Sequence, residues 1–170
     1  MSAHETDAFP FLSHVSECIE EVLARDIPFL GICLGGQLLA RVLGGEVHLR
    51  ANGEQGCHAV SLTEAGKTDA LFSGMPQRFV SFQWHYDSFE LPAGAAHLAT
   101  SGRCPYQAFR YGKAAYGLQF HPEVNREIVL DWSRQAGAAR QAEVAAAFVE
   151  AEASYRSQSM ILLNNFLRLA

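Results

Sequence analysis

The chain has 170 residues, 49% of them hydrophobic and 18% charged, and a formal net charge of −5. These values are typical of a soluble globular domain and exclude a disordered chain. Lys and Arg form no cluster and no apolar run approaches the length of a membrane span, so we expect neither a nucleic-acid nor a membrane partner.

The first 45 residues alternate between helix and strand. Apolar residues recur at helical spacing from Phe11 to Leu23, which predicts an amphipathic helix. The apolar run from Pro28 to Ile32 predicts a buried parallel strand. A second helix is predicted from Leu34 to Leu43, ended by two glycines. This order of elements is typical of an α/β sheet.

The middle of the chain is predicted to be rich in strands and the C-terminal part helical. A short helical turn is expected at Asp69 to Phe72, a hairpin turn at Tyr111 to Lys113, and helix from Asn125 to the end. No repeat or linker is found, so we expect one domain over residues 1–170. The expected strands are Glu46–Leu49, His58–Leu62, Phe79–Trp84, His97–Thr100, Gln107–Arg110 and Ala115–Phe120.

One of the four cysteines has the setting of a nucleophile. All four are widely spaced, without a Cys-x-x-Cys pair, which favours a reduced, cytoplasmic compartment. Cys33 lies in Gly-Ile-Cys-Leu-Gly-Gly, between the predicted strand and the second predicted helix, as in a nucleophile elbow with Cys in place of Ser. There the helix N-terminus favours the thiolate, and the Leu34 N–H is placed to donate to an oxyanion. The alternative is a packed, inert Cys in a glycine-rich turn.

A base and its orienting group are found near the end of the last predicted strand. The segment Gly-Leu-Gln-Phe-His-Pro-Glu places His121 at the carboxyl end of that strand, with Glu123 two residues later. Residues two apart in extended chain point the same way, so Glu123 is expected to hydrogen-bond the imidazole and fix its tautomer. An isolated His at a strand end is more often structural, but a Cys elbow upstream favours catalysis.

The two segments resemble the two signature motifs of the class I glutamine amidotransferases. The stretch Gln-Trp-His-Tyr-Asp-Ser-Phe from Gln83 is similar to the subgroup of GMP-synthase-like amidotransferases. The resemblance implies a flavodoxin-like α/β fold with a mixed, mostly parallel sheet flanked by helices. It also implies a catalytic triad of Cys33, His121 and Glu123. The residues implied to contact the substrate glutamine are Leu34, Gln37, Trp84, His85, Tyr86 and Asp87.

The implied reaction is hydrolysis of the glutamine side-chain amide through a cysteinyl thioester, with ammonia passed to an acceptor or to a partner synthetase. No cofactor and no metal are expected, because Cys57, His58, His85 and Cys104 lack the usual ligand spacing. Tyr86 stands where the family commonly has Gly, which would narrow the pocket or change how the backbone meets the substrate. A homo-oligomer is left open.

Two other functions are compatible with the same residues. One is a γ-glutamyl hydrolase or peptidase on the same fold, and the other is a catalytically impaired binding or regulatory domain. The second gains weight from the start of the chain, because the family's domain normally opens with further strands, a helix and a glycine-rich loop. We expect Met1 to be the Met of that loop, so that the N-terminal strands and a second oxyanion donor are missing.

Overall fold

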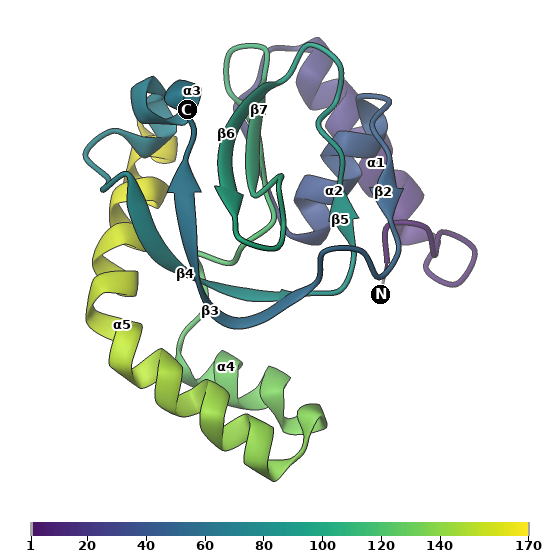
Figure 1. Cartoon of the computed structure of the whole chain (residues 1–170). Helices are drawn as coiled ribbons and strands as arrows, with labels where there is room; N and C mark the ends of the chain where they lie inside the picture. Colours follow the sequence, from purple (N-terminus) through teal and green to yellow (C-terminus); the bar gives the residue numbers. More distant parts are fainter. Residues whose placement is uncertain (1, 170) are drawn as a thin grey trace.

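A computed structural model describes residues 2–169 and contains a six-stranded sheet, a two-stranded sheet and flanking helices (Figure 1). The expected Met1 of the oxyanion loop lies outside the described residues. The larger sheet has the order β1-β8-β7-β6-β3-β4, and β2 pairs with β5 in the smaller one. The strands are β1 (Phe29–Ile32), β2 (Val47–His48), β3 (Glu54–Leu62), β4 (Arg78–His85), β5 (Ser88–Phe89), β6 (Ala96–Ser101), β7 (Ala108–Tyr111) and β8 (Ala115–Leu118). The helices are α1 (Phe11–Ala24), α2 (Leu34–Val42), α3 (Glu64–Thr68), α4 (Arg126–Ser133) and α5 (Ala138–Leu167), with short 3-10 turns η1 (Ala70–Phe72) and η2 (Arg134–Ala136).

The direction of the strands differs from the expectation. Only β1 and β8 run parallel, and the other four neighbouring pairs of the larger sheet are antiparallel. The mixed sheet flanked by helices is confirmed, but the prediction of mostly parallel strands is wrong for residues 2–169. Tight reversals make antiparallel pairs, whereas a parallel pair needs a long crossover. The predicted hairpin turn is an example, because Gly112 reverses the chain between β7 and β8 at a φ of 57°.

Two apolar cores lie on the two faces of the larger sheet. Helices α1 and α2 cover one face, and the C-terminal half of α5 covers the other (Figure 1). Leu12, Ile19 and Leu39 pack under the first pair of helices, and Phe72 and Leu162 lie in the core beneath α5. Burying one such side chain stabilises the fold by roughly 1.5–3 kcal/mol. The two cores therefore fix the sheet between its helices.

Helices α4 and α5 form a hairpin that reaches beyond the sheet (Figure 1). The expected continuous helix from Asn125 is wrong, because η2 and Gly137, at a φ of 88°, break it. The Asn125 side chain caps α4 by accepting from the N–H of Ile128 at 2.9 Å. The hairpin has its own apolar cluster, which includes Phe82 of β4 and Phe148 of α5. This cluster attaches the hairpin to the sheet beside the end of β4.

Several short elements are absent from the sequence prediction. Strand β3 begins four residues earlier than expected, and α3 and β5 were not predicted. Strand β5 has only two residues, which is too short for an alternating apolar pattern to emerge. No helix within residues 2–169 combines the length and the apolar character needed to cross a membrane.

Candidate active site

Cys33 occupies a strained turn between β1 and α2. Its φ of 50° and ψ of −104° lie outside the regions that residues with a side chain usually adopt. Two backbone hydrogen bonds hold the turn, from the Cys33 N–H to Leu118 O at 2.8 Å and from the Gln37 N–H to Cys33 O at 2.9 Å. The elbow geometry expected from the sequence is therefore present, with Cys33 at the first residue before the helix.

Two glycines allow the strand, the turn and the helix to approach one another. A Cβ on Gly31 would lie 2.4 Å from Gly35 O, and a Cβ on Gly36 would lie 2.6 Å from Leu118 O. Gly35, by contrast, has open space where its Cβ would be. The expectation that the glycine two residues after the cysteine relieves crowding is wrong, because the helix turns its next residue toward β8. The close contact is instead made by Gly36.

His121 and Glu123 form the pair expected from the sequence. The Nδ1 of His121 donates to Oε1 of Glu123 at 2.6 Å. The backbone N–H of His121 donates to Phe82 O at 2.8 Å, which fixes the residue beside β4. Nε2 is buried and has no hydrogen-bond partner within residues 2–169. The tautomer set by Glu123 therefore leaves Nε2 as the nitrogen available for chemistry.

Cys33 and Glu123 determine the charge of this imidazole. Burial lowers the pKa of His121, but hydrogen bonds and charge interactions with Cys33 and Glu123 outweigh burial and raise it to about 9. The imidazole is thus protonated at neutral pH and holds a proton that it can give to a leaving group. This protonation requires Cys33 and its base to be neighbours, as the resemblance implied.

A pocket of about 560 Å³ opens over Cys33. All six residues expected to contact substrate line it, together with four that were not predicted: Ser2, Glu5, Leu49 and Arg50. Tyr86 is 60% exposed and lies at the mouth, so its side chain does not fill the pocket. The four unpredicted residues belong to no recognisable motif and reach the pocket through the fold alone.

Buried amides connect the pocket wall to the sulfur. The Nε2 of Gln37 donates to Asp87 O at 3.1 Å and to Oε1 of Gln119 at 3.4 Å. Gln119 in turn directs its Nε2 toward the Sγ of Cys33 at 3.7 Å. Gln119 is completely buried and was not predicted as a site residue, although it lies inside the second motif. It offers the sulfur a side-chain donor in addition to the backbone.

A buried carboxylate supports the other side of the pocket. Glu54 accepts from Nε2 of Gln107 at 2.6 Å and from the Ser101 hydroxyl at 2.8 Å, and lies 3.8 Å from Nε2 of His85. Burial raises the pKa of Glu54, but His85, Ser101 and His58 lower it further, so that its net shift is downward. Nδ1 of His85 donates to Asp87 O at 2.9 Å. The segment expected to bind glutamine therefore rests on an ionised group in the interior.

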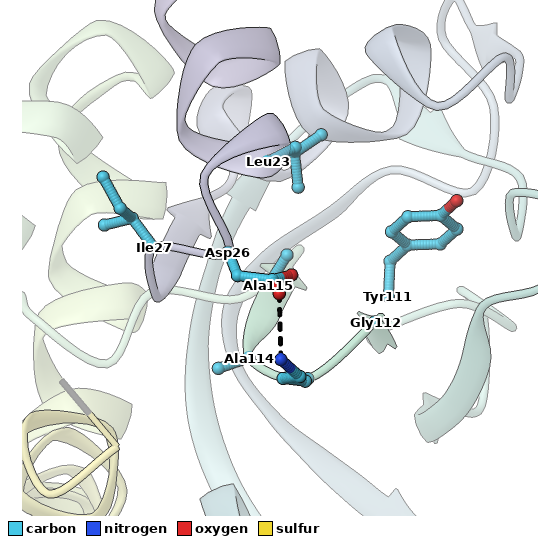
Figure 2. Close-up of a pocket in the computed structure, with 8 residues that line it drawn as sticks. Leu23, Asp26, Ile27, Tyr111, Gly112, Ala114 and Ala115 are labelled. Atoms are coloured by element: carbon cyan, nitrogen blue, oxygen red, sulfur yellow. Dashed lines mark hydrogen bonds and ion pairs between the residues drawn. The ribbon is translucent and has the colours of Figure 1, made fainter.

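Other clusters of the described residues lack this combination of groups. A hollow of about 50 Å³ lies between the end of α1 and the β7–β8 turn, where Lys113 pairs with Asp26 at 2.9 Å (Figure 2). It contains neither a nucleophile nor a base. The four residues considered for a metal site are not gathered around one point, and the only potential ligand group within residues 2–169 is Glu46, His48 and Glu90 at the surface.

Comparison with known protein families identifies a match over most of the chain. The family model described as glutamine amidotransferase class-I matches residues 8–128. The amidotransferase subunit of a glutamine-hydrolyzing GMP synthase from Archaeoglobus fulgidus is 38% identical over 117 residues, which are 68% of this chain and 62% of the relative. A glutamine-hydrolyzing GMP synthase from Alkaliphilus metalliredigens is 42% identical over 109 residues, 63% of this chain and 21% of that protein. The chain thus spans less than two thirds of these relatives.

Solved structures agree with the sequence comparison. The crystal structure of a glutamine amidotransferase from Thermotoga maritima superposes with a TM-score of 0.84 at 37% identity, covering 99% of this chain and 74% of that one. A glutamine amidotransferase from Methylobacillus flagellatus gives a TM-score of 0.82 at 25% identity, with 99% and 73% covered. The α/β fold predicted from the sequence is therefore confirmed.

Proposed function

The chain belongs to the class I glutamine amidotransferase family, and from that membership we propose that it hydrolyses the side-chain amide of glutamine. The observation that carries the proposal is the strained Cys33 elbow, at the floor of a pocket and beside a histidine held at 2.6 Å by Glu123. A cysteine nucleophile, a base and an orienting carboxylate are the groups that acyl transfer from an amide requires.

We infer the following sequence of steps. The Cys33 sulfur attacks the amide carbon, and the new oxyanion accepts a hydrogen bond from the Leu34 N–H. The carbon–nitrogen bond breaks as His121 gives its Nε2 proton to the departing ammonia. Water then attacks the glutamyl thioester while His121 takes its proton, and glutamate leaves with Cys33 restored. Glu123 keeps the imidazole in the required tautomer throughout.

The substrate's amino-acid end is proposed to lie along the Trp84–Asp87 segment. Asp87 O faces the pocket and is held by Gln37 and His85, so it is positioned to accept from an ammonium group. Glutamine fits a pocket of about 560 Å³ with the amide directed toward Cys33. The names of the relatives suggest that the ammonia is used in GMP synthesis by a partner synthetase, and we propose such a partner for this chain. Cytoplasmic localisation is proposed because Cys18, Cys33, Cys57 and Cys104 are free thiols.

Release of glutamate from glutamine tests the proposal. Purified wild type is compared with Cys33→Ala and with Cys18→Ala, which removes an exposed cysteine on α1. We expect Cys33→Ala to reduce the rate by at least about a thousandfold and Cys18→Ala to leave it unchanged. Mass spectrometry of acid-quenched enzyme is expected to find a glutamyl adduct on Cys33 only.

Three results would lead to other conclusions. Hydrolysis of γ-glutamyl peptides without hydrolysis of free glutamine would assign the γ-glutamyl hydrolase function. Equal activity of wild type and Cys33→Ala would exclude the nucleophile. A folded wild type without activity on either substrate would contradict a self-sufficient glutaminase and favour a binding or regulatory domain.

A further inference from the structure

One hydroxyl from α5 holds the backbone on both sides of Glu123. Tyr155 is 1% exposed, and its hydroxyl donates to His121 O at 2.9 Å and accepts from the Val124 N–H at 3.0 Å. Burial raises the pKa of this hydroxyl above its usual value, so it keeps its proton and can donate. The two hydrogen bonds span the Pro122-Glu123 dipeptide.

Glu123 depends on this backbone for its position. Its carboxylate accepts from Nδ1 of His121 and is 38% exposed. No other donor to this carboxylate is found within residues 2–169. The separation of Glu123 from the imidazole is therefore set by the path of the chain from His121 to Val124, which the Tyr155 hydroxyl fixes at both ends.

The other C-terminal helix contacts the imidazole ring itself. Trp132 of α4 packs against His121 with ring centroids 4.8 Å apart and an interplanar angle of 72°. This edge-to-face contact restricts rotation of the ring about its own axis. Both Trp132 and Tyr155 lie outside residues 8–128, the part of the chain that the family model matches.

We propose that Tyr155 and Trp132 are positioning residues for the His121–Glu123 pair, Tyr155 through the backbone and Trp132 through the ring. The proposal rests on the glutaminase function proposed above and extends it to the C-terminal helices. Displacement of a catalytic group by about 1 Å can cost on the order of a hundredfold in rate. The α4–α5 hairpin is thus part of the catalytic apparatus as well as of the apolar core.

The first experiment compares Tyr155→Phe with Tyr116→Phe. Tyr116 is an equally buried tyrosine whose hydroxyl donates to Oδ1 of Asp69 at 3.0 Å, away from the His121 loop. Both variants lose a buried hydroxyl, and only the first loses the connection to the loop. We expect Tyr155→Phe to reduce kcat by about tenfold or more with KM for glutamine within about twofold, and Tyr116→Phe to keep kcat within about twofold.

A second readout does not depend on turnover. The titratable groups that face His121 are Cys33 from the elbow, Glu123 from its own loop and the Tyr155 hydroxyl from α5. When Tyr155→Phe loosens Glu123, the His121 titration followed by NMR is expected to move from about 9 toward lower pH. Tyr116→Phe should leave this titration in place. If wild type released no glutamate, the proposed function would fail, and the NMR titration would still decide the positioning role.

Failure of Tyr155→Phe to fold leaves a second variant. Trp132 is only half-buried, so Trp132→Leu removes the ring contact with a smaller demand on the core. We expect a reduced kcat at unchanged KM. A His121 titration identical to that of wild type in every folded variant would overturn the proposal. So would a loss of kcat in Tyr155→Phe no larger than in Tyr116→Phe.

Discussion

Replacement of Gly36 by Ala should damage the fold and the elbow together. The new Cβ would lie 2.6 Å from Leu118 O and 3.1 Å from Leu118 N, so the backbone of β8 must move by about 0.4 Å to restore even a 3.0 Å contact. Leu118 O is also the acceptor of the Cys33 N–H. A shift that relieves the new contact therefore disturbs the hydrogen bond that holds the nucleophile.

The magnitude follows from a matched pair of variants. Gly35→Ala and Gly36→Ala gain the same helix propensity in α2, up to about 1 kcal/mol, because each replaces a helical glycine. Gly35 has free space for a Cβ and Gly36 does not. The difference in unfolding free energy between the variants is therefore the cost of overpacking, about 1–3 kcal/mol against Gly36→Ala.

Urea unfolding and glutamate release measure the two effects. Each kcal/mol corresponds to a lowering of Tm by about 2–4 °C for a chain of this size. We expect Gly35→Ala to be at least as stable as wild type, and Gly36→Ala to be less stable and also slower. Equal stability of the two variants would refute the assignment of the close approach to Gly36.

Three further results are expected. Activity should fall as pH rises through about 9, because His121 then loses the proton it gives to ammonia, and Glu123→Gln should move this fall to lower pH in a pH–rate profile. Gln119→Leu removes the amide that points at the Cys33 sulfur and should reduce kcat by about tenfold, measured against an unchanged far-UV CD spectrum. Glu54 has a lowered pKa, so its contribution to stability is present above the unfolded value of 4.5 and is lost as pH falls below it. Glu54→Gln should therefore be less stable than wild type by about 1–3 kcal/mol in urea at pH 7, and the difference should shrink under acid.

The sequence predicted the parts of the site that belong to local patterns. Cys33 stands in a strand–turn–helix pattern and Glu123 follows His121 at the spacing of extended chain, and both geometries are found. Glu54 and Tyr155 were missed because neither belongs to a local pattern. Glu54 is one polar residue in a strand, and Tyr155 is one aromatic residue in an alanine-rich helix.

Strand direction was mispredicted for a related reason. The buried run that became β1 carries the mark of a parallel strand, and it is parallel to β8. The middle strands have similar apolar composition, but their direction is set by the turns that join them and by pairing with distant segments. Composition indicates burial, whereas direction depends on connections.

The pairing of β1 with β8 has a consequence for how this architecture tolerates change. Leu118 stands opposite Ile32, so the cysteine and the motif that carries the histidine leave neighbouring strands in the same direction. The spacing between them is therefore fixed by one register, and the long stretch of chain between the two strands does not enter it. Insertions and deletions in that stretch can accumulate at exposed turns without altering the distance between nucleophile and base, which gives the scaffold freedom to acquire new substrates or partners.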